Sequence, residues 1–149
     1  MTSQQRSQGS AHSREYVRRL LRAAEDADPD RYVRAIQPLQ DKVIHVIIET
    51  AVDEEFYISA DDGGIGVHTR SDGEAPDLLV RVSPKALKRI LEGHETPVEA
   101  FFMGNLRARG STKDLYMLHA LFVALAEIAV TSPEIQEIIE EFQTAKQDS

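Results

Sequence analysis

The chain of 149 residues is 42% hydrophobic and 28% charged, a balance typical of one globular domain with a buried core. It contains no cysteine, which excludes disulfide frameworks, thiolate catalysis and cysteine zinc sites. Its net charge of -8 disfavours broad nucleic-acid binding, because neutralising phosphates requires a basic face. No uncharged apolar run is long enough for a bilayer span, and the first residues lack a secretory signal's apolar segment. We therefore expect a cytoplasmic location.

The N-terminal part is predicted to be a flexible tail followed by two helices. Residues 1–13 are rich in Ser and Gln and nearly free of aliphatic side chains, so we expect them to be disordered. From Arg14 onward, apolar residues recur at the spacing of a helix. Asp28 and Pro29 then signal a second helix, with Asp as the N-cap and Pro in the first turn. Pro38 is expected to end it.

A β region of four strands is predicted next. The β-branched run at 43–50 is typical of a central strand, and residues 56–59, 65–68 and 78–82 alternate apolar and polar side chains. The Asp and Gly residues at 61–64 favour a tight hairpin turn. Because the connections are short, the four strands are predicted to form an antiparallel meander. The side chains expected on its inner face are Ile44, Val46, Ile48, Phe56, Ile58, Ile65, Val67, Leu78, Val80 and Val82.

Two short helices follow the predicted meander. Ser83 and Pro84 form the start signal of the first, and Gly93 is expected to stop it. Thr96 with Glu99 three residues later has the spacing of a capping box, which predicts the start of the second.

A fifth strand and two long helices complete the predicted fold. Residues 104–110 are interpreted as a strand with Leu106 and Ala108 on one face and arginines on the other. The segment 115–130 is almost wholly apolar, so we expect a buried helix packed across the sheet. Ser132 and Pro133 begin the last helix, which carries a narrow apolar stripe formed by Ile135, Ile138, Ile139 and Phe142.

The polar residues give little support for catalysis. The five histidines show no spacing typical of a metal-binding helix, and His119, within the apolar segment, is interpreted as a core histidine. No nucleophile elbow or phosphate-binding glycine loop is present. The acidic groups at 53–55 and 61–62 are interpreted as turn residues. We therefore predict no catalytic residue, no metal and no cofactor.

Two local concentrations of residues suggest binding. Basic residues outnumber acidic ones seven to three between Arg81 and Lys113, which indicates either a solvated surface or a landing area for an anionic head group or membrane. Large flexible apolar side chains also gather near the fifth strand, where they either fill the core or line an adaptable cavity. These side chains are Phe101, Phe102, Met103, Leu106, Leu115, Met117, Leu118 and Phe122.

The order of motifs at 77–122 resembles the sterol carrier protein type 2 (SCP-2) sterol-transfer family. The segments that carry the resemblance are Asp77-Leu-Leu-Val-Arg-Val-Ser-Pro, the helix ending at Leu-Glu-Gly93, and Thr96-Pro-Val-Glu-Ala-Phe-Phe-Met-Gly-Asn-Leu-Arg-Ala-Arg-Gly110. The resemblance implies an α+β fold in which a five-stranded, mainly antiparallel sheet has helices packed on one face. Residues 14–149 are then a single lipid-binding domain that encloses an apolar tunnel.

The resemblance also implies where a lipid would bind. The ligand-binding residues it implies are Phe56, Ile58, Phe101, Phe102, Met103, Leu106, Leu115, Leu118 and Phe122. The stripe of the last helix, Ile135, Ile138, Ile139 and Phe142, would act as a lid. The segment Gly110-Ser-Thr-Lys-Asp114 departs from the family pattern, which puts the form of the tunnel entrance in doubt.

The favoured hypothesis is a non-enzymatic protein that binds and carries an apolar lipid, such as a fatty acyl chain or sterol. Its partners would be a lipid or fatty-acid ligand and, transiently, a membrane surface, with no nucleic acid. The alternative is a dimerisation or accessory interaction module with a collapsed core, serving a lipid or quinone pathway; the partner in dimerisation would be a second copy of the chain, giving a homodimer. An enzyme is the third and least favoured hypothesis.

Overall fold

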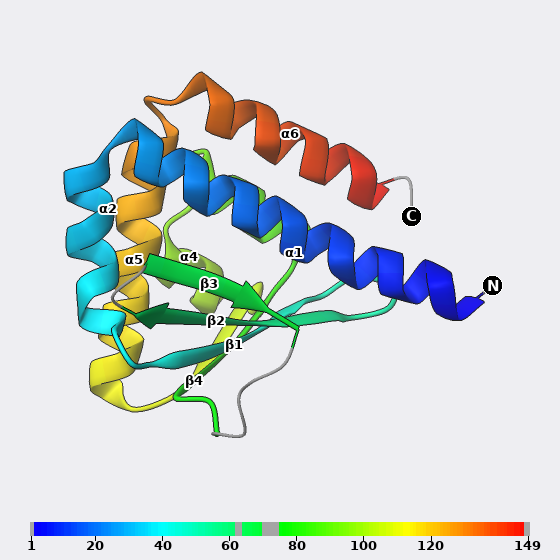
Figure 1. Ribbon diagram of the computed structural model, residues 1–149, viewed down its shortest axis with the longest axis horizontal. Coiled ribbons are helices and arrows are strands. Elements are labelled where there is room, and N and C mark those ends of the chain that lie inside the picture. The colour runs from blue at the N-terminus through cyan, green and yellow to red at the C-terminus, as the bar shows by residue number, and fades with distance from the viewer. Residues whose placement is uncertain (1, 62–63, 70–74, 148–149) are drawn as a thin grey trace.

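The computed structural model describes residues 2–61, 64–69 and 75–147, with the backbone alone described at 2–12 and 144–147. A five-stranded sheet carries helices on one face, as the α+β prediction requires (Figure 1). The strands are β1 (Val43–Ile48), β2 (Glu54–Asp61), β3 (Gly64–His68), β4 (Leu78–Val82) and β5 (Leu106–Arg109). The helices are α1 (Thr2–Ala27), α2 (Pro29–Ile36), the 3-10 turn η1 (Gln37–Leu39), α3 (Pro84–Leu91), α4 (Pro97–Phe102), α5 (Thr112–Ala129) and α6 (Pro133–Gln147).

The strand order is β3-β2-β1-β4-β5, so the predicted meander is wrong at β4. β4 pairs in parallel with β1, while the other three pairs are antiparallel. Asp77 holds the beginning of β4 beside the beginning of β1. Its N–H donates to the Val43 carbonyl and its Oδ2 accepts from the Val43 N–H, both at 2.8 Å. Apolar β4 therefore lies between β1 and β5 as an inner strand of the sheet. The predicted hairpin turn at 61–64 includes positions 62–63, which lie outside the described residues.

The predicted inner face of the sheet is confirmed. Rows of apolar side chains cross it from strand to strand: Ile44 lies opposite Ile58 on β2 and Leu78 on β4. All ten predicted residues are buried in the core or packed against it. β5 continues the rows, since its Ala108 and Leu106 pair with Val80 and Val82. The helices therefore cover a continuous apolar surface.

The helix starts follow the predicted capping signals. The Asp28 side chain accepts from the Arg31 N–H at 3.2 Å, and the Ser83 hydroxyl accepts from the Ala86 N–H at 3.1 Å. Gly93 has a positive φ of 79°, a conformation that glycine adopts at no steric cost, and it follows the end of α3 as expected. These local signals were sufficient to predict where the helices begin, because a capping side chain satisfies backbone N–H groups within the same segment.

α1 begins at Thr2 instead of the predicted Arg14. The polar residues before Arg14 include no proline, so the helix can extend toward the N-terminus even though Gly9 is a weak helix former. The flexibility expected of residues 1–13 in solution stays a prediction.

The expected burial of α5 is only half right. Leu118, Leu121, Leu125 and Ile128 face the core, whereas Tyr116 is 77% exposed. Neighbouring elements cover one side of α5 and leave its other apolar side open. Within the described residues, no single helix is long and apolar enough to cross a membrane; only α5 with residues 133–143 meets those criteria, and the pair is bent by 110°.

Tyr32 of α2 is almost fully buried, which makes stability depend on pH in the alkaline range. Burial, with a smaller contribution from Glu25, raises the pKa of Tyr32 to about 12. An unfolded tyrosine titrates near pH 10, so the folded state holds the proton more tightly. We expect about 2–3 kcal/mol of stability, fully present below pH 10, to be lost as the pH rises from 10 to 12. Urea unfolding at pH 9 and pH 12 should show this loss of stability in the native protein and a smaller loss in Tyr32→Phe. Equal losses in the two proteins would contradict the role of Tyr32.

Candidate functional site

An apolar groove lies between α4, β5 and α5, with a volume of about 310 Å³. Nine of its ten lining residues are apolar, and the tenth is a histidine. They are Pro97, Val98, Phe101, Phe102, Leu106, Ala108, Leu115, Leu118, His119 and Phe122. The volume is at the lower end of the range of about 300–1,000 Å³ found for small-molecule sites.

Local capping signals fix two of the three walls, α4 and α5. Thr96 and Glu99 make the predicted capping box at the start of α4, with reciprocal bonds of 3.1 and 3.2 Å. The Ser111 hydroxyl accepts from the Asp114 N–H at 3.1 Å and so caps α5. Asp114 is buried, and its Oδ1 lies 3.3 Å from Nζ of Lys42, which ties the first turn of α5 to the start of β1.

Six of the nine predicted ligand-binding residues line this groove: Phe101, Phe102, Leu106, Leu115, Leu118 and Phe122. The other three do not. Phe56 is 0% exposed within the core, Ile58 is packed against that core, and Met103 is 73% exposed beyond α4. The structure thus brings together the residues of α4, β5 and α5 and separates them from those of β2.

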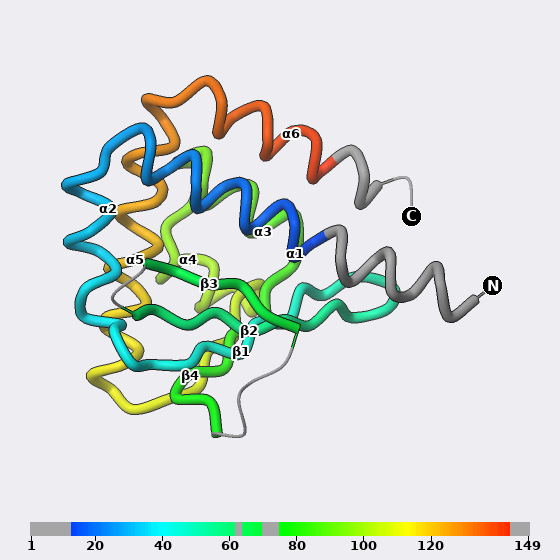
Figure 2. The backbone as a smooth tube through the Cα atoms, viewed as in Figure 1, coloured from blue at the N-terminus to red at the C-terminus, as the bar shows by residue number. Residues whose placement is uncertain are grey.

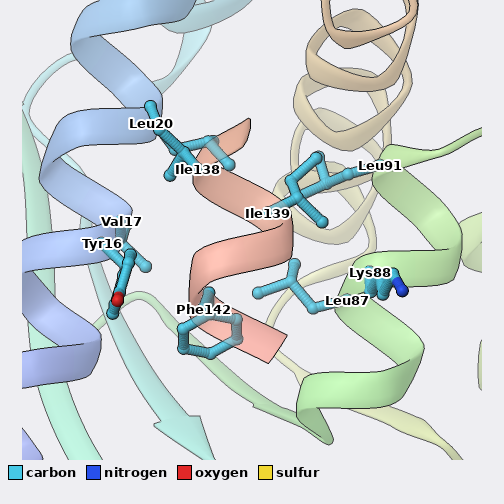
Figure 3. Close-up of a pocket in the computed structure, with 9 residues that line it drawn as sticks. All are labelled: Tyr16, Val17, Leu20, Leu87, Lys88, Leu91, Ile138, Ile139 and Phe142. Carbon is cyan, nitrogen blue, oxygen red and sulfur yellow. The ribbon is translucent and has the colours of Figure 1, made fainter. Parts of the chain in front are cut away.

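The predicted lid residues lie elsewhere in the helix layer. α6 runs beside α1 (Figure 2) and also packs against α3. Ile138, Ile139 and Phe142 point from α6 toward α1 and α3 and line a space of only about 20 Å³ (Figure 3). The fourth, Ile135, is 1% exposed. Side-by-side packing of α1 and α6 is reinforced by the Arg19–Glu141 ion pair at 2.9 Å, whose hydrogen bond raises the pKa of Arg19.

Sequence reasoning missed His119 as a member of the groove. Its position had a usable signal: it follows Leu115 by four residues and precedes Phe122 by three, so all three lie along one side of a helix. His119 is half-buried, and it makes no hydrogen bond or ion pair with any residue that the structure describes. The structure also adds Pro97, Val98 and Ala108 to the lining.

Exposed apolar side chains lie in the groove lining and at positions next to it in sequence on α4 and α5. We call Val98, Phe101, Phe102, Met103 and Tyr116 the apolar rim; each is about half exposed or more. The rings of Phe101 and Phe102 meet edge to face, with centroids 6.0 Å apart. Soluble domains seldom gather exposed apolar groups of this size unless they contact another apolar phase.

Part of the basic excess at 81–113 is neutralised within the fold. Arg81 pairs with Asp53 at 2.9 Å, and Arg89 pairs with Glu95 at 3.3 Å. Arg107, Arg109 and Lys113 form no ion pair with a described residue. The two arginines alternate with Leu106 and Ala108, so they lie on the face of β5 opposite the groove, as predicted. Among the described residues, no three His, Asp or Glu side chains gather in a way that could hold a metal ion.

Comparison with known sequences gives one family match. The model of the SCP-2 sterol transfer family matches residues 19–123, which include every residue of the groove but not α6. A comparison with curated proteins finds no match.

Comparison with solved structures gives the same fold. The chain is similar to the sterol carrier protein domain 2 of Helicoverpa armigera, at 22% identity and a TM-score of 0.59 over 76% of this chain and 87% of that one. It is also similar to sterol carrier protein 2 from Yarrowia lipolytica in its apo form, at 17% identity and a TM-score of 0.54 over 83% and 94%. A third match is the ubiquinone synthesis protein UbiJ-SCP2, at 21% identity and a TM-score of 0.51 over 67% and 77%. At these identities the likeness establishes the fold.

Proposed function

The chain belongs to the SCP-2 sterol transfer family, and on this premise we propose that it binds and carries an apolar lipid in the groove between α4, β5 and α5. Family membership supports a lipid-binding or lipid-transfer domain. The observation that carries the finer proposal is the groove itself, because its walls are apolar apart from one histidine. We propose that the protein acts by binding alone, without catalysis.

The energetics of such binding are favourable. Burying a methylene group contributes about 0.8 kcal/mol, so roughly ten buried carbons contribute on the order of 8 kcal/mol before the costs of association. The groove volume of about 310 Å³ favours a medium-length chain or one part of a larger lipid. Phe101 and Phe102 are exposed at its mouth, where their rings could fold over a bound chain.

The proposal includes a transient contact with a membrane surface. The apolar rim would enter the lipid interface. Arg107, Arg109 and Lys113 on β5 and α5, which form no ion pair with a described residue, would favour anionic head groups. Contact at the rim would let a lipid move between bilayer and groove without full exposure to water.

The rim also favours a second candidate function. Exposed aromatic side chains are common where two protein surfaces join, so the same residues suit a homodimer or an accessory module. The fold shared with a ubiquinone synthesis protein is compatible with such a module in a quinone pathway. Native mass spectrometry separates the two: a co-purified lipid mass supports carriage, and a lipid-free, concentration-dependent dimer supports the module.

A single tryptophan tests the lipid proposal directly, since the chain has none of its own. In Phe102→Trp, we expect sodium decanoate or another matching lipid to shift the emission to the blue, because the ligand removes water from the indole. Val130→Trp, exposed at the far end of α5, should show no such shift and serves as the control. No response from Phe102→Trp to decanoate, 1-decanol or a sterol would contradict carriage in this groove.

A further inference from the structure

β3 and β5 are the two edges of the sheet, and the apolar groove lies at β5. At β3 the Val67 carbonyl accepts a hydrogen bond from the Arg18 guanidinium at 2.9 Å, so it points away from β2. Backbone groups alternate in direction along an antiparallel strand, and the N–H and C=O of Ile65 therefore point the same way. The Ile65 N–H and C=O and the Val67 N–H bond no residue that the structure describes. Three backbone groups are thus unpaired along this edge.

A cavity of about 480 Å³ adjoins these unpaired groups, between β3 and the neighbouring α1 (Figure 1). All five residues of β3 and Tyr32 of α2 line it. The lining residues from α1 follow the spacing of one helix face and are Arg18, Leu21, Arg22 and Glu25. The volume falls within the range of about 300–1,000 Å³ found for ligand sites. The edge of β3 therefore has room beside it for a ligand.

Tyr32 adds an unpartnered hydroxyl to the cavity. The residue is only 3% exposed, and its hydroxyl makes no hydrogen bond with a described residue. Buried polar groups normally have a partner, so a hydroxyl left without one at the wall of a cavity points to a ligand. Arg22, which also lines the cavity, likewise makes no hydrogen bond or ion pair within the described part of the chain. Both side chains can donate to an oxygen atom of a ligand.

The unpaired backbone groups indicate which kind of ligand fits. N–H and C=O groups that alternate along a free strand edge match the backbone of another extended chain, which is how peptides add to sheets. A hydrocarbon chain has no atom that could bond them. A second copy of this protein carries α1 beside its own β3, so the two α1 helices would obstruct pairing between the edges. One extended segment needs only the spacing of neighbouring strands, about 4.8 Å.

We propose that the cavity between α1 and β3 binds an extended segment of a partner protein, which joins the sheet as a sixth strand beside β3. In an antiparallel alignment, one residue of the segment exchanges two hydrogen bonds with Ile65, and a carbonyl two residues away accepts from the Val67 N–H. Arg18 keeps its bond to the Val67 carbonyl. Tyr32 and Arg22 favour a segment with a side-chain oxygen on the side that faces α1. This inference goes beyond the proposed function, because the site lies at the other edge of the sheet and requires no lipid.

Selection of displayed random heptapeptides on the full native chain tests this proposal. We expect enriched peptides that, once synthesised with blocked ends, bind with an affinity measurable by fluorescence polarisation. Ile65→Pro should weaken this binding by about tenfold or more, because it removes an N–H that the peptide backbone needs. That N–H points away from β2, so proline leaves the ladder of β2 and β3 intact. Ile65→Val keeps the N–H and is the matched control, with unchanged affinity expected. Circular dichroism checks that both variants fold.

Two measurements on the native protein make the test independent of how the variants fold. Methylating one peptide nitrogen at a time should abolish binding at alternate positions only, since alternate N–H groups face β3. Hydrogen exchange of the Ile65 and Val67 amides should slow by at least tenfold when the peptide is added.

Three outcomes would overturn the proposal. The first is that no heptapeptide is enriched. The second is that the enriched peptides tolerate methylation at every position and bind Ile65→Pro as they bind the native protein. The third is a dimer of the chain that Ile65→Pro abolishes, which would show that a second copy occupies the edge of β3. None of these outcomes bears on lipid binding in the groove at β5, so the proposed function is tested separately.

Discussion

Phe56→Ala is expected to lower the free energy of unfolding by about 3–5 kcal/mol, the usual cost of removing a buried phenyl ring. Phe56 is 0% exposed, and on β2 it lies opposite Val46 in the sheet. Its ring packs into the core that the helices share with the sheet. Truncation would leave a cavity that surrounding strands cannot fill without disturbing their register. Urea denaturation monitored by circular dichroism measures the change.

The matched control is Phe102→Ala, the same substitution at a ring that is 79% exposed. Its effect on stability should stay within about 0.5 kcal/mol. The contrast separates a phenylalanine that holds the fold together from one that is free to meet a ligand. A cost below about 1 kcal/mol at Phe56 would instead indicate space beside β2, which is where the family resemblance implied a tunnel.

Local features of the fold could be predicted because the residues that cause them are neighbours in sequence. The capping box of Thr96 and Glu99 closes within four residues, and the alternation of Ile44, Val46 and Ile48 requires only the two-residue period of a strand. The same period correctly placed Arg107 and Arg109 on the side of β5 away from Leu106.

Features that depend on distant segments were predicted less well. Nothing within residues 78–82 says whether that strand pairs with β3 or with β1, since its apolar alternation suits either neighbour. The pairing with β1 is set by contacts between segments more than thirty residues apart, such as Asp77 with Val43. For the same reason, composition could not show that one side of α5 would stay uncovered.

In the candidate site, too, the residues close together in sequence were predicted correctly, and those whose position depends on distant segments were not. The resemblance identified the residues of α4, β5 and α5, which are close in sequence and meet around one groove. It also grouped Phe56 and Ile58 with them, although only the packing of the whole chain determines which sheet residues reach a groove. Hydrophobicity likewise could not tell whether the stripe of α6 covers a groove or packs against α1 and α3, because both roles need an apolar face (Figure 3).

Filling the groove should abolish most lipid binding without unfolding the protein. Ala108 projects from β5 into the groove and is only partly buried, so Ala108→Phe would place a phenyl ring in the space that a chain is proposed to occupy. An aromatic side chain suits a strand, and we expect stability to change by less than about 1 kcal/mol. If the ring displaces about four methylene groups, the loss is near 3 kcal/mol, a weakening of roughly 200-fold for decanoate in titration calorimetry.

Arg107→Phe is the matched control for this variant, because it adds the same ring to the same strand on the face turned away from the groove. Decanoate affinity should change little in this control, apart from the small effect of one lost surface cation. A folded Ala108→Phe protein that bound decanoate as the native protein does would mean that the ligand lies elsewhere. The space lined by Arg18, Tyr32 and Val67, between α1 and β3, would then be the next site to test.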